Sequence, residues 1–145
     1  MGSNDEPRWV TTILEWPLIW LLARLVLLSE YLFGGAAKLF DFSSAVGEQA
    51  HFGLEPAWLW ASMAIVGELS GSFVILINRL VWLGAGGLGV LTVVAMLVAN
   101  KFWDARGHDR VQVLNGFLER AGLVAGFVLV AMIASRRNST DNEEL

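Results

Sequence analysis

Three ionisable side chains interrupt stretches of sequence that are otherwise apolar. Arg24 and Glu30 lie in the first stretch, and Glu68 lies in the second. If these stretches are helices with level ends at Phe40 and Ala57, the two carboxyl groups lie about 15 Å and about 16 Å from those ends and share a depth. Arg24 lies about 24 Å from the same end, so its long side chain could reach between the two carboxylates.

An arginine between two carboxylates leaves a net negative charge in an apolar interior, so one carboxyl is expected to keep its proton. Such an arrangement would be a proton-handling site. The competing interpretation is a buried ion pair that only fixes how the helices pack. Both interpretations place the charges inside the protein, because a charge that faces lipid costs several kcal/mol.

Two further side chains share the polar face of the first stretch. Tyr31 and Lys38 lie close to Arg24 around the axis of a helix. The Tyr31 ring, with neighbouring aromatic side chains, could stack on a bound ring system. Lys38 lies near the end of the stretch, so we expect its ammonium group to reach the lipid headgroups or the last carbonyls of the helix.

The composition predicts that a membrane surrounds these residues. Of the 145 residues, 55% are hydrophobic and 17% are charged, and the charges gather at the ends and in a few short segments. Apolar stretches of this length are typical of helices that cross a bilayer. We therefore predict an all-α fold, an integral membrane four-helix bundle over residues 16–135, with spans at residues 16–40, 57–77, 80–102 and 111–135. Residues 1–15 are predicted to be an N-terminal tail or interfacial segment, and residues 136–145 a disordered C-terminal tail.

The charge and the residue types argue against several functions. The net charge of −4 and the lack of a basic run beyond Arg136 and Arg137 disfavour a nucleic-acid partner. The chain has no cysteine, which excludes disulfides, thiolate chemistry and cysteine-held iron-sulfur clusters. The two histidines, His51 and His108, lie in predicted loops, so we expect no haem between helices and no metal site. Lys and Arg residues are divided equally between the two sides, which leaves the orientation open.

Glycines recur at helical spacing in the predicted spans. Residues 84–89 match the GxGxxG pattern of dinucleotide-binding loops, but they lie inside an uncharged span where a pyrophosphate cannot bind. Gly67 and Gly71 are four residues apart, as are Gly122 and Gly126. We expect these small residues to let the helices pack closely.

The order and spacing of several motifs resemble those of the DoxX family, small bacterial membrane proteins with four helices. Arg24, Gly35 and Lys38, within ARLVLLSEYLFGGAAKLFDF, are similar to the R…G..K signature that opens the family's pattern. Further similarities follow at Pro56, at Glu68 with Ser70-Gly71, at Asn78-Arg79 and at Lys101-Phe102-Trp103. The resemblance extends from about Leu18 to Met132.

The resemblance implies the family's fold, a multi-pass location in the bacterial inner membrane and functional roles for four residues. These residues are Arg24, Lys38, Glu68 and Arg79. Glu30 departs from the apolar residue that is usual at its place in the family. Members of the family are similar to a subunit associated with thiosulfate:quinone oxidation, or are linked to membrane complexes that respond to oxidative stress.

We therefore expect a redox-associated inner-membrane subunit that binds a quinone near the first two spans. Arg24 and Glu68 would orient or protonate the headgroup, and Tyr31 would stack on it. No intrinsic cofactor is expected, so electrons would come from a redox partner protein or a diffusible cofactor.

Two alternatives to the quinone-linked subunit are a non-enzymatic scaffold or lipid-interacting protein and a small-molecule or proton-coupled transporter. Catalysis by the chain itself stays open. The expected partners are the lipid bilayer, a membrane or redox protein, and further copies of the chain in a homo-oligomer.

Overall fold

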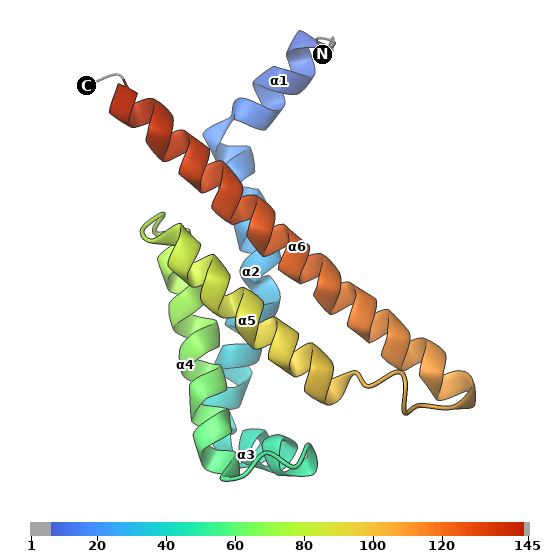
Figure 1. Ribbon diagram of the computed structural model, residues 1–145. Helices are drawn as coiled ribbons and strands as arrows, with labels where there is room; N and C mark the ends of the chain where they lie inside the picture. The colour runs from blue at the N-terminus through green and yellow to red at the C-terminus, as the bar shows by residue number, and fades with distance from the viewer. Residues whose placement is uncertain (1–6, 144–145) are drawn as a thin grey trace.

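The computed structural model describes residues 7–143, which form six helices and contain no strand (Figure 1). The helices are α1 (Arg8–Glu15), α2 (Pro17–Phe40), α3 (Phe42–His51), α4 (Ala57–Leu76), α5 (Val81–Ala99) and α6 (Gly107–Glu143). In this part of the chain α2, α4, α5 and α6 are long and apolar enough to cross a membrane. The prediction of an all-α membrane bundle with four spans is therefore confirmed. Residues 1–6 and 144–145, at the ends of the two predicted terminal segments, lie outside the described residues.

Large apolar side chains cover the outer surface of the long helices. Phe33 is 79% exposed and Phe40 is 90% exposed. Val26, Phe73 and Val90 are also more exposed than buried. Such side chains are unfavourable in water and stable in hydrocarbon. The outer surface of the bundle is therefore a surface that contacts lipid.

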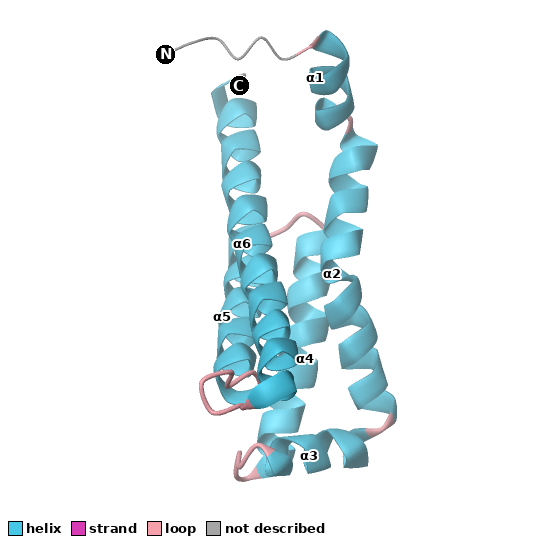
Figure 2. Ribbon diagram, turned by 90° about the vertical axis from the view of Figure 1, so that its right-hand side faces the viewer, coloured by secondary structure: helices cyan, strands magenta, loops and turns pink. Residues whose placement is uncertain are grey.

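The long helices form two pairs that meet closely at one end of the molecule (Figures 1 and 2). α2 packs against α4, and α5 packs along α6. The short turn at residues 77–80 joins α4 to α5, and the two helices diverge toward the other end, where α3 packs against α4. The core that joins the pairs includes the buried side chains of Leu28, Ile75, Leu88 and Phe127. The helices are therefore close together at the end of the bundle that contains the turn, and they are apart at the opposite end, where α3 lies.

Local sequence signals set several helix boundaries. Pro17 disfavours a helical backbone at the residue before it, so Trp16 is extended, with a ψ of 124°, and separates α1 from α2. Asp41 begins α3, because its carboxylate accepts a hydrogen bond of 3.0 Å from the backbone N–H of Ser44. Gly107 begins α6 with a φ of +63°, a conformation that favours glycine.

The terminal segments are more helical than the sequence predicts. Disorder is predicted from residue 136 onward, whereas α6 continues to Glu143. Extending a helix that is already formed in the membrane costs little, because each added residue also adds a hydrogen bond. The described part of the N-terminal segment is the helix α1, which has a polar and an apolar face.

Glycines let α4 and α5 approach closely beside the turn. A Cβ atom on Gly84 would lie 2.9 Å from the carbonyl oxygen of Gly71 and 2.8 Å from Ile75. A Cβ atom on Gly71 would lie 2.8 Å from Leu88. The packing role expected of the glycines therefore holds at these two positions. By contrast, a Cβ atom on Gly86 would meet nothing within 4 Å.

We expect Gly84→Ala to destabilise the protein by about 1–3 kcal/mol, because the new methyl group would collide with the backbone of Gly71. Gly86→Ala is the matched control on the same helix, where alanine improves helix propensity by up to about 1 kcal/mol and meets no neighbour. Thermal unfolding in detergent should show a lower Tm for Gly84→Ala and an unchanged or higher Tm for Gly86→Ala. Equal Tm values for the two variants would contradict the close contact between α4 and α5.

Candidate functional site

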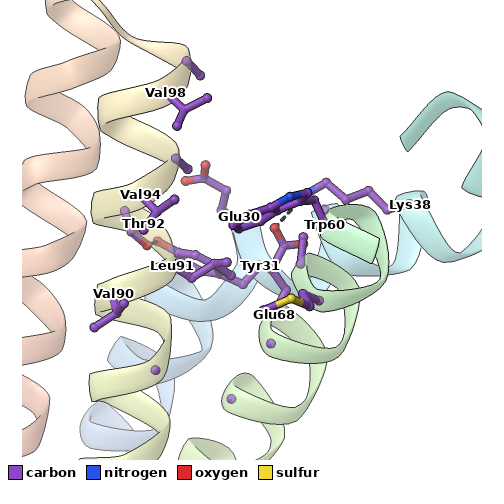
Figure 3. Close-up of a pocket in the computed structure, with 18 of the residues that line it drawn as sticks. Glu30, Tyr31, Lys38, Trp60, Glu68, Val90, Leu91, Thr92, Val94 and Val98 are labelled. Carbon is purple, nitrogen blue, oxygen red and sulfur yellow. Dashed lines mark hydrogen bonds and ion pairs between the residues drawn. The ribbon is translucent and has the colours of Figure 1, made fainter. Parts of the chain in front are cut away.

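A cavity of about 580 Å³ lies where α4 and α5 diverge (Figure 3). α2 lies behind it, and α3 borders it at the open end of the bundle. The apolar walls include Trp60, Met63, Leu91, Val94 and Val98. The polar side chains in the cavity include Glu30, Tyr31, Lys38 and Glu68. The fold thus brings four of the six candidate residues to one site.

An ion pair between Lys38 and Glu68 lies at the centre of the polar region. Lys38 Nζ donates to Glu68 Oε1 at 2.6 Å, and the two side chains are 23% and 12% exposed. Glu68 Oε2 is buried and has no hydrogen-bond partner. Lys38 therefore does not extend to the headgroups as expected, but turns inward to the carboxylate. The free oxygen of Glu68 can accept a further hydrogen bond.

Gly35 sets the depth at which the ion pair forms, because it lets α2 lie directly against α4. A Cβ atom on Gly35 would lie 2.9 Å from Leu69 and 3.3 Å from the Cβ atom of Glu68. Gly35 lies five residues before the end of α2, whereas Glu68 lies eleven residues after the start of α4. The two helix ends therefore differ in height by about 9 Å. The assumption of level ends is wrong, because α3 and the loop after it supply the chain length for this offset.

Arg24 lies outside the cavity and does not bridge the two carboxylates. Its Nη1 donates to the carbonyl oxygen of Ile75 at 2.9 Å and to Asn78 Oδ1 at 3.0 Å. Both partners lie at the end of α4 and in the turn that follows, where Asn78 and Leu80 have φ values of +57° and +48°. The prediction of Arg24 between the carboxylates is therefore wrong. The offset between α2 and α4 places Arg24 level with the turn, where it adds a second hydrogen bond to the Ile75 carbonyl, which also accepts from the backbone N–H of Asn78.

Tyr31 connects α2 to α5 beside the cavity. Its Oη lies 2.6 Å from Thr92 Oγ1. Because Thr92 donates its one hydroxyl proton to the carbonyl oxygen of Leu88 at 2.7 Å, Tyr31 is the donor to Thr92. The Tyr31 ring also packs edge-to-face against Phe127 of α6, with ring centroids 5.3 Å apart. Tyr31 therefore holds three helices together and forms part of the cavity wall.

The remaining candidates lie at the edge of the site or outside it. Glu30 and Glu68 both line the cavity, but the side chain of Glu30 is exposed. The prediction that Glu30 lies inside the protein is therefore wrong, because its side chain lies at the open edge of the cavity. Arg79 is exposed in the turn at the opposite end of the bundle and does not line the cavity. Within the part of the chain that the structure describes, no three His, Asp or Glu residues gather as metal ligands.

Three residues of the site are not among the six candidates predicted from the sequence. Trp60 and Arg120 line the cavity, and Thr92 is the partner of Tyr31. Thr92 is a polar residue inside an uncharged span and Arg120 is a charge inside the last predicted span, so both residues leave a signal in the sequence. The sequence does not show that α6 packs along α5 and so brings Arg120 to the cavity.

A comparison with protein families identifies the class of this protein. The family model described as DoxX matches residues 19–101, which include the ion pair and the turn after α4. Because the match covers more than half of the chain, the chain belongs to the DoxX family. No curated protein and no solved structure matches the chain.

We expect Lys38→Met to destabilise the protein by about 3 kcal/mol, because the carboxylate of Glu68 would remain in an apolar site without its counter-charge. The double variant Lys38→Met with Glu68→Leu should lose less stability than the single variant, since it leaves no unpaired charge. Denaturation in mixed micelles measures both values. Lys101→Met, an exposed position in the loop before α6, is the control. Glu68→Leu alone completes the comparison. A double variant whose loss of stability equals the sum of the losses in Lys38→Met and Glu68→Leu would show that the two charges are not coupled.

We expect Arg24→Met to lower the free energy of unfolding by about 1.5–3 kcal/mol, the usual contribution of hydrogen bonds from a charged group. Arg79→Met removes the same charge from the same end of the bundle, but from an exposed side chain, and should have little effect. Thermal unfolding of the two variants in detergent tests this difference. A loss that is equal in both would argue that Arg24 contributes only through charge.

Proposed function

We propose that this DoxX-family protein is a quinone-binding subunit of a redox complex in the bacterial inner membrane. The observation that carries the proposal is the free Oε2 of Glu68, which lies buried beside the Lys38 ammonium in a cavity whose walls are largely apolar. A ligand for this cavity needs an apolar body, a group that accepts from an ammonium and a group that donates to a carboxylate. A quinol meets both requirements, because each ring hydroxyl can accept one hydrogen bond and donate another.

The walls of the cavity suit an amphiphilic ligand that enters from the lipid. Leu83 and Val90 line the cavity and are themselves exposed on the outer surface of α5. An isoprenoid tail can therefore leave the cavity along α5 without contacting water. Trp60 provides an aromatic surface near the ion pair for a flat ring (Figure 3).

The chain's own residues would bind the headgroup and handle its protons. A bound quinone supplies two-electron, two-proton redox chemistry. Lys38 Nζ is placed to donate a hydrogen bond to a ring oxygen, and Glu68 Oε2 is placed to accept one. Glu30 at the edge of the cavity and Glu48 of α3 are exposed carboxyls through which Glu68 could exchange a proton with water.

The electrons would reach the site from another protein. The chain has no cysteine to hold an iron-sulfur cluster or to form a redox disulfide. This protein is therefore proposed to bind and protonate the quinone while a redox partner supplies the electrons. Quinone binding by this chain and electron supply by a partner agree with the quinone-linked role implied by the resemblance to the family.

We expect decylubiquinol, the reduced form with two ring hydroxyls, to raise the Tm of the protein in detergent, because a ligand that binds only the folded state stabilises it. The Glu68→Gln variant should bind at least about tenfold more weakly, which corresponds to about 1.4 kcal/mol. Glu119→Gln makes the same change on α6 outside the cavity and should bind like the wild type. The dimethyl ether of the same quinol, which has no hydroxyl to donate to Glu68, should stabilise much less. Equal stabilisation by both molecules would contradict a site for the quinone headgroup.

A second pair of variants tests the same cavity without touching the ion pair. Gly87 lines the cavity and has open space around a Cβ atom, so Gly87→Leu should fill part of the cavity and weaken decylubiquinol binding. Gly86→Leu makes the same change on the neighbouring residue, which does not line the cavity. Titration of both variants should show weaker binding only for Gly87→Leu. Unchanged binding in Gly87→Leu would place the quinone elsewhere.

A further inference from the structure

A second cluster of charged and aromatic side chains lies in the half of α2 that is remote from the cavity. The guanidinium carbons of Arg24 and Arg137 lie 4.9 Å and 5.2 Å from the centroid of the Trp20 ring. Both contacts are cation–π interactions. One indole therefore gathers two positive charges, one from α2 and one from the C-terminal part of α6.

Among the side chains that the structure describes, those of residues 7–139, no carboxylate pairs with either of these two charges. The hydrogen bonds of Arg24 go to two neutral oxygens, those of Ile75 and Asn78, and the positive charge of Arg137 opposes that of Arg24. Arg24 is only 6% exposed, and its buried Nε has no hydrogen-bond partner. A buried charge without a counter-charge is unfavourable. The cluster therefore has the properties of a site for an anion.

A second cavity, of about 400 Å³, adjoins this cluster between the turn after α4 and the C-terminal part of α6. Its polar lining consists of Asn78, Ser135, Asn138 and Ser139. Asn78 is shared by the two features, because it accepts from Arg24 and lines the cavity. The two guanidinium groups do not line this cavity, but Asn78 connects it to Arg24. The amide groups of Asn78 and Asn138 can donate to a phosphate, which has several acceptor oxygens and binds arginine strongly.

The cluster lies at the level of the lipid headgroups. α4 and α5 have 20 and 19 residues, just enough to cross a hydrocarbon core of about 30 Å, so the turn between them lies at one membrane surface. Arg24 bonds to this turn. Trp82, which lines the second cavity, is exposed, as tryptophans at the membrane surface commonly are.

We propose that Trp20, Arg24 and Arg137, with the polar residues of the second cavity, bind the phosphate of an anionic phospholipid. A lipid rather than a free ion is favoured because the site combines exposed apolar walls, at Leu80 and Trp82, with its polar lining. The bound phosphate supplies the missing counter-charge to Arg24 and so stabilises the turn that Arg24 holds.

Native mass spectrometry of the full-length protein tests this proposal, with phosphatidylglycerol and phosphatidylcholine of matched acyl chains as probes. We expect one phosphatidylglycerol to remain bound with at least a fivefold preference over phosphatidylcholine. Arg137→Gln should reduce that retention at least fivefold, because it removes one of the two guanidinium groups beside Trp20. Arg110→Gln, an exposed position at the opposite end of α6, is the matched control and should retain lipid like the wild type.

Two results would overturn the proposal. The first is equal retention of both lipids, or equal retention by the Arg137→Gln and Arg110→Gln variants. The second is displacement of phosphatidylglycerol by millimolar inorganic phosphate, which would assign the site to a free anion instead of a lipid. Persistence of the bound lipid in phosphate, together with its loss in Arg137→Gln, supports the lipid assignment.

Discussion

A lysine and a glutamate can pair inside a bilayer only where the protein keeps lipid away from both charges, and the helices around Lys38 and Glu68 meet this requirement. Gly35 lets α2 lie against α4, so that the ammonium and a carboxylate oxygen meet at 2.6 Å. α3 borders the open end of the bundle, and the bond from Tyr31 to Thr92 ties α2 to α5 beside the pair. One carboxylate oxygen remains free and buried, so the same pair that fixes the packing also leaves a site for a polar ligand.

The two ends of the bundle differ in how closely α4 and α5 approach each other. At the turn, Gly71 and Gly84 bring α4 and α5 into contact, and Arg24 donates a hydrogen bond to the end of α4. At the other end, the same two helices diverge and leave the cavity in which we propose that a quinone binds. A single helix, α2, thus supplies a cation to each end. The proposed lipid site at the turn and the proposed quinone site in the cavity are separate in space and can be tested independently.

The sequence predicts the class of fold well, because four apolar stretches of membrane length leave little choice of architecture. Charges in apolar stretches also identify Lys38 and Glu68 as residues of one polar site, whereas Arg24 and Arg79 lie outside the cavity. The sequence does not predict which charges pair, because the chain of α3 allows an offset between α2 and α4 that brings Lys38, rather than Arg24, to Glu68. The position of Arg120 at the cavity depends on how α6 packs along α5, which the sequence does not show.

In the proposed complex, a quinone headgroup lies against the ion pair in the cavity between α4 and α5. Photolabelling of the protein in its native membrane with an azido-quinone, followed by peptide mapping, tests this position. We expect the label on cavity residues such as Met63 of α4 and Leu91 or Val94 of α5, and less labelling there in Glu68→Gln. Labelling spread over the outer surface, at exposed residues such as Phe33 and Leu129, and unchanged in Glu68→Gln would contradict it.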